Sequence, residues 1–236
     1  MKTGEILSNS LLYPLHNIRS LVLFMLLGII GGLAGGTTIV GIIVGSMDQN
    51  TFEITVSAVL GLIVLAIICL VILGYTLDII KYGVDKREDG PNINIKRQIP
   101  NAIKLLIVDI VYYIIPVIIT FILGFIFKNW IANCIGFVLM ALFALANFMA
   151  KCRLSKSSSL GQALAVGQAI GDISRIGISK VVTAVILIFV VMIVIGIIIL
   201  LLLSFNSIIG SVAFGILGVY AIFVYNRAIG LLYSNI

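Results

Sequence analysis

The sequence predicts an all-α integral membrane protein, a bundle of about six transmembrane helices arranged as three hairpins with amphipathic cytoplasmic lead-in helices. Hydrophobic residues make up 61% of the 236 residues and charged residues only 10%, whereas soluble domains carry about 25% charged residues. Apolar runs longer than about 18 residues recur, and that length indicates a bilayer span. Nearly all lysines and arginines also fall on one side of the resulting threading.

Six apolar segments are long enough to cross a bilayer as helices. Their continuous apolar character differs from the alternation of a membrane β-strand, and helices satisfy their own backbone groups in lipid. We expect one domain over residues 1–236. The predicted spans cover about residues 20–45, 54–80, 103–127, 130–150, 180–203 and 208–230.

Two further segments are amphipathic and too polar to span. Residues 5–18 place Leu7, Leu11, Leu12 and Leu15 at helical spacing. Residues 157–179 repeat apolar side chains at the same spacing, with Asp172 and Arg175 between them. We expect both to be helices that lie at the cytoplasmic face.

The basic residues predict the orientation. Fourteen of the fifteen lysines and arginines fall in the termini, the second connection or the fourth connection, and only Lys128 falls on the opposite side. The first connection instead carries Asp48 and Glu53. Since cytoplasmic loops carry the excess of basic residues, we expect a multi-pass protein of the cell membrane with both termini in the cytoplasm.

The first span is rich in small residues four positions apart, a spacing that lets helix backbones approach closely in lipid. We therefore expect its glycines to pack helices rather than to line a substrate path. The last span has a weaker version at Ser211 and Gly215, so both spans are predicted inside the bundle and the fifth span on its lipid face. The predicted packing residues are Gly28, Gly31, Gly32, Gly35, Gly36, Gly41 and Gly45.

One stripe of the third span combines an acid with a helix-breaking proline near mid-membrane. An acid inside a span is costly unless it is paired or hydrated, which makes this stripe a candidate transport or ion site. Pairing of the acid with Lys104, Lys81 or another cation at a helix end is the structural alternative. The stripe contains Asp109, Tyr113, Pro116 and Thr120.

Asp78 lies near the end of the second span, three residues before Lys81. A salt bridge within that helix is one interpretation. If Asp78 instead faced Asp109, the two carboxylates would raise one pKa and form a proton or cation site.

The connection after the second span is basic but diluted by acids. We expect a solvated turn that contacts anionic lipids or a partner at the cytoplasmic face, through Lys86, Arg87, Lys96 and Arg97. Basic residues are not interleaved with aromatic ones, so no nucleic-acid partner is expected. The lipid bilayer is the expected partner, and the sequence leaves oligomerisation open.

No catalytic constellation is evident, so we expect neither an enzyme nor a cofactor. His16 is the only histidine, and Cys69, Cys134 and Cys152 stand alone in different segments. Neither a disulfide framework nor a metal site is predicted.

Three passages resemble an uncharacterised multi-pass membrane family, the domain of unknown function numbered 4013, found mostly in archaea. They are Leu12-Tyr13-Pro14-Leu15, Gly74-Tyr75-Thr76-Leu77 and Asn101-Ala102-Ile103-Lys104-Leu105-Leu106. The resemblance extends from about Leu7 to Ile229. It implies a multi-pass membrane protein without an assigned activity, and it assigns no functional residue.

Two hypotheses for the function follow. The first is a small permease or channel-like carrier that uses a kinked third span and Asp109. The second is a non-catalytic membrane scaffold, an envelope protein whose cytoplasmic segments bind a partner or lipid.

Overall fold

The computed structural model describes residues 1–127 and 130–235, and within these residues every regular element is an α-helix. Lys128, the basic residue predicted on the opposite side, lies outside the described residues. The helices are α1 (Thr3–His16), α2 (Ile18–Met47), α3 (Thr51–Val84), α4 (Ile95–Phe127), α5 (Trp130–Ser157), α6 (Leu160–Ala163), α7 (Val166–Ile176), α8 (Ile178–Phe205) and α9 (Ser207–Tyr233).

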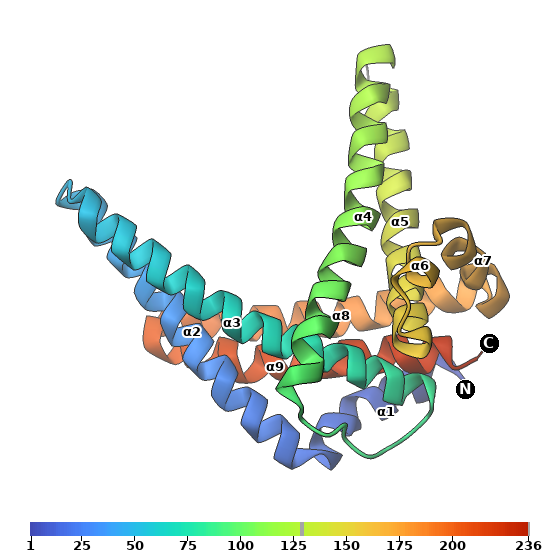
Figure 1. Ribbon diagram of the computed structural model, residues 1–236, viewed down its shortest axis with the longest axis horizontal. Helices are drawn as coiled ribbons and strands as arrows, with labels where there is room; N and C mark the ends of the chain where they lie inside the picture. The colour runs from blue at the N-terminus through green and yellow to red at the C-terminus, as the bar shows by residue number, and fades with distance from the viewer. Residues whose placement is uncertain (128–129, 236) are drawn as a thin grey trace.

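Six of these helices, namely α2, α3, α4, α5, α8 and α9, are long and apolar enough to cross a membrane. They pair in chain order as the hairpins α2–α3, α4–α5 and α8–α9 (Figure 1). The prediction of an all-α multi-pass membrane protein built from three hairpins is confirmed.

Several helices continue beyond the predicted spans. The fourth span was predicted to end near residue 150, whereas α5 continues to Ser157; α4 likewise begins at Ile95 instead of near residue 103. Hydropathy follows the lipid boundary, but backbone hydrogen bonds continue into the polar region beyond it. The helix ends therefore carry basic side chains out of the apolar layer.

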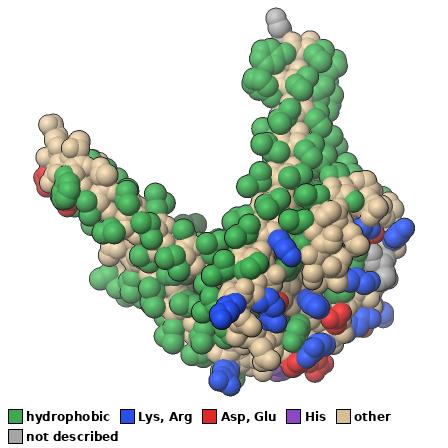
Figure 2. Space-filling model, viewed as in Figure 1, with side chains coloured by type: hydrophobic (Ala, Val, Ile, Leu, Met, Phe, Trp, Pro, Cys, Tyr) green, Lys and Arg blue, Asp and Glu red, His purple; other side chains and the backbone are tan. Residues whose placement is uncertain are grey.

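The hairpins converge at one end of the molecule and separate toward their tips. Figure 1 shows α2–α3 and α4–α5 diverging as two arms. Figure 2 shows apolar side chains covering both arms, whereas lysines, arginines and most acids gather where the helices converge. We call this region the basic end. It comprises α1, residues 81–104, residues 151–180 and the last turns of α9.

Helix α9 is the interior helix, and it packs against α1, α2, α3 and α8. The prediction that α2 also lies inside the bundle is wrong, because its buried residues are only Leu21, Phe24, Gly28, Gly31 and Gly45. Helix α8, the predicted lipid-facing span, buries only Val181, Ala184, Ile188 and Ile199. Small residues thus mark close contact on one face of α2 without enclosing that helix.

An aromatic cluster forms part of the core where α2, α3 and α9 cross. The ring of Phe24 stacks on Tyr75 with centroids 4.3 Å apart, and Phe223 lies 5.7 Å from Phe24 and 5.5 Å from Tyr75. All three side chains are buried. Aromatic pairs at such distances stabilise a core beyond the area they bury.

The two amphipathic segments differ in how closely they match the prediction. Helix α1 covers the first one, with Leu12 and Leu15 exposed and Ile6, Ser10 and Tyr13 turned inward. The single helix predicted over residues 157–179 is wrong, since the segment contains the short α6 and then α7. Ser158 adopts a φ of 56° before α6, and Gly177 adopts a φ of 102° after α7. These two positive-φ residues separate the segment from α5 and α8, whereas the break between α6 and α7 lies at Leu164 and Ala165.

Candidate functional site

Asp78, near the end of α3, is held by α4. Its carboxylate accepts a hydrogen bond from Arg97 at 2.9 Å and lies 3.5 Å from the amide nitrogen of Asn101. Arg97 also donates to the backbone carbonyl of Asn92 at 2.9 Å. The predicted salt bridge between Asp78 and Lys81 is wrong, because the cation comes from the next helix.

Asp109 joins α4 to α5. Lys151 Nζ lies 2.8 Å from the Asp109 carboxylate, and Asn147 donates to the same oxygen at 2.8 Å. The predicted partner Lys104 instead donates to the backbone carbonyl of Ser158 at 3.1 Å. The acid is therefore paired with a cation at a helix end, as one interpretation had it, although with a different lysine.

The two acids do not form a carboxylate pair. Asp78 meets α4 at Arg97 and Asn101, and Asp109 lies eight residues beyond Asn101. Eight residues extend roughly 12 Å along a helix. Each acid has its own cation, so the condition for a proton or cation site, two carboxylates that face each other, is not met.

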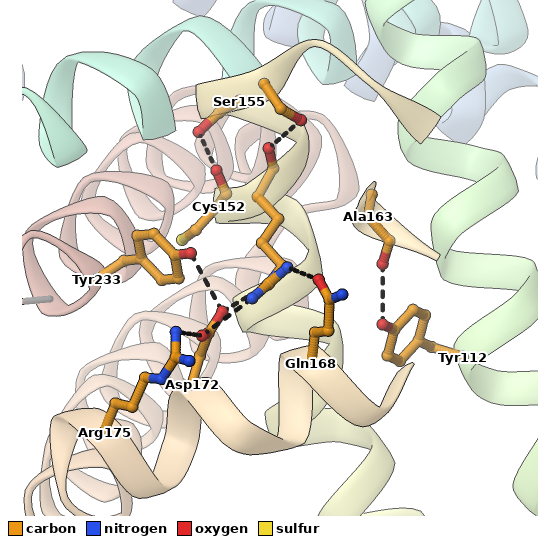
Figure 3. Close-up of polar contacts among 10 residues, drawn as sticks. Tyr112, Cys152, Ser155, Ala163, Gln168, Asp172, Arg175 and Tyr233 are labelled. Carbon is orange, nitrogen blue, oxygen red and sulfur yellow. Dashed lines mark hydrogen bonds and ion pairs between the residues drawn. The ribbon is translucent and has the colours of Figure 1, made fainter. Parts of the chain in front are cut away.

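A third acid, Asp172 on α7, lies at the centre of a network that sequence reasoning missed (Figure 3). Its side chain is 1% exposed, and Arg153 contacts both carboxylate oxygens, at 2.5 and 3.1 Å. Tyr233 donates to the same carboxylate at 3.1 Å, and Gln168 accepts from Arg153 at 2.5 Å. The network joins α5, α7 and α9.

A signal for this network is present in the sequence. Ala169, Asp172, Ile173 and Ile176 follow one another at i, i+3, i+4 and i+7, so the acid falls on the apolar stripe of its helix. An acid on a stripe that packs against other helices requires a buried cation. Arg153, on the extension of α5 beyond the predicted span, supplies that cation.

The rest of the predicted stripe on α4 is not gathered around Asp109. Tyr113 is 43% exposed, whereas its neighbour Tyr112 is buried and donates to the carbonyl of Ala163 at 2.9 Å. Pro116 is buried within the continuous helix, and the Thr120 hydroxyl donates to its carbonyl at 2.7 Å. The hydroxyls of Tyr112 and Thr120 therefore each donate to a backbone carbonyl and not to Asp109.

A groove of about 690 Å³ lies between α4 and α5 toward their tips. Thr120, Gly124 and Gly136 contribute to its wall, together with several aromatic side chains. Asp109 does not line this groove. The groove therefore offers a mostly apolar surface separate from the paired acid.

The predicted packing glycines form two sets along α2. A Cβ on Gly28 would lie 2.8 Å from Val219 Cγ2 and would meet the backbone of Gly215 on α9. Gly32 faces the backbone of Ser211 on α9, and Gly36 faces the side chain of the same serine. The remaining residues face α3, with Gly31 beside Ile68, Gly35 beside Leu65, Gly41 beside Ser57 and Gly45 beside Ile54. Close approach of backbones, as in other lipid-embedded helix pairs, accounts for the contacts of Gly28 and Gly32 with α9.

The four basic residues predicted to contact lipid or a partner differ in their availability. Arg97 is committed to Asp78, and Arg87 pairs with Asp89 at 2.6 Å while lying 4.1 Å over the Tyr82 ring. Hydrogen bonding between Arg87 and Asp89 lowers the pKa of the acid and raises the pKa of the arginine. The side chains left exposed for another contact are Lys86 and Lys96.

The family comparison matches residues 57–204, from within α3 to near the end of α8, to the family described as protein of unknown function (DUF4013). The matched part is shorter than the predicted extent and excludes the passage around Tyr13. No curated protein and no solved structure matches the chain. An archaeal source stays a prediction. Because the match covers more than half of the 236 residues, the chain belongs to the DUF4013 family.

Proposed function

We propose that the protein is a non-catalytic membrane scaffold, in which a charged base fixes three apolar helical hairpins. The observation that carries this proposal is the pairing of Asp109 with Lys151 and Asn147. The acid that made α4 a candidate transport helix instead joins α4 to α5. Its charge is compensated by groups of the chain itself.

The other two acids have the same role at different helix junctions. Asp78 joins α3 to α4 through Arg97, and Asp172 joins α7 to α5 through Arg153. Removal of one partner from a buried pair leaves an uncompensated charge, so such pairs hold the elements in one arrangement. Three junctions of this kind at one end of the molecule support a structural base.

We infer that the basic end faces the cytoplasm and that both termini lie there, in the cell membrane. Support comes from the distribution of lysines and arginines, since cytoplasmic segments carry the excess of these residues. The exposed side chains of Lys86 and Lys96 would then meet the anionic headgroups of the inner leaflet. The apolar arms would contact the lipid chains.

A small permease or channel-like carrier is the competing function, and the stripe on α4 is its basis. Such a carrier needs a polar path to a group that is free to bind and release its substrate. Asp109 is held at 2.8 Å by both Lys151 and Asn147, and the groove between α4 and α5 does not include it. The geometry therefore supports the scaffold better.

Ion flux into proteoliposomes distinguishes the two functions. The full chain and its Asp109→Asn variant would be compared with protein-free liposomes, using dyes for protons, sodium and potassium. We expect no flux above the protein-free level from either protein. We also expect the substitution to lower the free energy of unfolding by about 1–3 kcal/mol, because Lys151 loses its partner at a half-buried position.

The matched control is Asp89→Asn, which removes an exposed acid at the same end of the molecule. It should leave both stability and flux close to those of the unsubstituted protein. Flux by the unsubstituted protein that Asp109→Asn abolishes and Asp89→Asn retains would overturn the scaffold proposal in favour of a carrier.

A further inference from the structure

A small cavity at the basic end is lined partly by polar side chains. It has a volume of about 240 Å³ and lies between α1, the connection after α3 and the last turns of α9. Figure 1 shows α1 running beside the C-terminal part of α9. A water molecule occupies about 30 Å³ in the liquid, so the cavity has room for a group larger than one water. Its polar lining residues are Asn9, Tyr13, His16, Lys86, Glu88 and Arg227.

Arg227 is a buried cation that forms no salt bridge with the described residues, since Glu88 and Asp89 act on it only from beyond salt-bridge distance. The residue is 4% exposed, and its Nε and Nη1 atoms are buried without a hydrogen-bond partner in that part of the chain. Two other arginines at helix junctions pair with a carboxylate, Arg97 with Asp78 and Arg153 with Asp172. A buried guanidinium with unused donors is costly, which indicates a missing partner with acceptor oxygens.

Tyr13 adds a second unused donor next to this guanidinium. The Tyr13 ring lies 4.4 Å from the central carbon of the Arg227 guanidinium, and its hydroxyl is buried without a partner in the described ranges. Burial raises the pKa of Tyr13, so the hydroxyl keeps its proton and remains a donor. The guanidinium and the hydroxyl therefore both offer hydrogen-bond donors, and neither carries a negative charge.

The charges at the cavity favour an anion. Lys86 and Arg227 contribute two cations, and Glu88 contributes one carboxylate at an exposed position. Arginine matches the planar arrangement of oxygens in carboxylates and phosphates. Leu12 and Leu15 on the outer face of α1 are 45% and 51% exposed, which places this rim where an interfacial helix would meet lipid headgroups.

We propose that this cavity binds a phosphate group through the Arg227 guanidinium and the Tyr13 hydroxyl. Lys86 lies at the rim and adds electrostatic attraction. The phosphate comes either from the headgroup of a phospholipid or from a free phosphate ion. The proposal goes beyond the scaffold function and stands whether or not that function is correct.

Binding would be measured with the full-length chain purified in detergent. The probes are inorganic phosphate, phosphatidic acid and diacylglycerol. The diacylglycerol has the same acyl chains as the phosphatidic acid and serves as the lipid without a phosphate group. Thermal stabilisation and native mass spectrometry would report binding. Stabilisation by inorganic phosphate supports a soluble source, and stabilisation by phosphatidic acid but by neither other probe supports a headgroup source. Failure of both phosphate-containing probes overturns the proposal.

Two variants test the residues. Arg227→Met should weaken binding by at least about tenfold, since it removes a charged donor, and Tyr13→Phe should weaken it by about three- to tenfold. Tyr13→Phe removes only one oxygen, so it keeps the test valid if Arg227→Met fails to fold. Affinity unchanged by Tyr13→Phe and Arg227→Met overturns the proposal.

Glu88→Gln is the matched control at the rim of the same cavity. It should strengthen binding, because it removes the carboxylate that repels the phosphate. If it instead lowers the melting temperature of the ligand-free protein as much as Arg227→Met does, Glu88 is the partner of the guanidinium and the proposal is overturned.

Discussion

The Asp172 side chain on α7 links three helices, because it contacts Arg153 on α5 and Tyr233 on α9. It is 1% exposed, and Arg153, which is 14% exposed, contacts both of its oxygens. Tyr233 supplies a further hydrogen bond from α9. A buried carboxylate is tolerated here because Arg153 balances its charge and both Arg153 and Tyr233 donate hydrogen bonds to its oxygens. The same dependence makes the site sensitive to the loss of a single charge.

We expect Asp172→Asn to lower the free energy of unfolding by about 3–5 kcal/mol, because it leaves Arg153 buried without its anion. Unfolding of the purified protein in a denaturing-detergent titration would measure the change. The exposed pair of Arg87 and Asp89 provides the control, and Asp89→Asn should leave stability close to that of the unsubstituted protein, because solvent screens an exposed pair.

The double variant Asp172→Leu with Arg153→Met separates charge from packing. It should be more stable than Asp172→Asn alone, since a buried ion pair replaced as a whole by apolar groups costs less than a broken one. Equal destabilisation by the single and double variants would show that the pair does not account for the effect.

At the scale of elements, the contact between α2 and α9 depends on backbones that approach each other closely. A Cβ on Gly28 would lie 3.1 Å from the Gly215 carbonyl carbon, and backbone cannot move aside as a flexible side chain can. Gly218 lies on α9, as Gly215 does, and a Cβ on Gly218 would meet no atom of a neighbouring helix or side chain among the described residues within 4 Å. The two glycines therefore differ in the space beside them, although both lie in spanning helices.

Gly28→Ala should lower the free energy of unfolding by about 1–3 kcal/mol, because the added methyl group forces α2 away from α9. Gly218→Ala should be neutral or should stabilise the protein by up to about 1 kcal/mol, because alanine favours helix more than glycine does. Equal effects of the two substitutions in the same unfolding assay would contradict the close contact.

The helices could be predicted from the sequence because lipid imposes a local requirement. A span must be apolar over its own length, so hydropathy locates it without knowledge of its neighbours. The ion pairs depend on contacts between helices and could not be located in this way. Asp78 has Lys81 three residues away, yet it pairs with Arg97, nineteen residues away on α4.

The same limit applies to burial and to the candidate site. The glycines of α2 predicted a close contact between helices. The number of helices that surround α2 depends instead on how the three hairpins diverge from the basic end. Tyr112 and Tyr113 are adjacent in the sequence, and only the packing of α4 decides that Tyr112 faces inward. Arg227 is one of the basic residues that predict the orientation, and only its surroundings in the fold show that two of its nitrogens are buried without a hydrogen-bond partner among the described residues.

At the scale of the whole molecule, the fold brings distant basic segments to one end. Residues 81–104 and residues 151–180 meet there, and the α2–α3 tip, with Asp48 and Glu53, lies at the far end of its arm (Figure 1). This arrangement agrees with one common orientation of all three hairpins, since each hairpin begins and ends at the basic end. The inference that this end faces the cytoplasm therefore applies to all hairpins at once.

Single cysteines at the two ends test that orientation. In a variant with Cys69, Cys134 and Cys152 replaced by serine, Asp85→Cys and Gln49→Cys would be treated with a membrane-impermeant maleimide. Both positions are exposed. We expect intact cells to label only the cysteine at position 49, because basic segments remain on the cytoplasmic side. Permeabilised cells should label both. Labelling at position 85 in intact cells would place the basic end outside, and the lipid contacts proposed for that end would then belong to the outer leaflet.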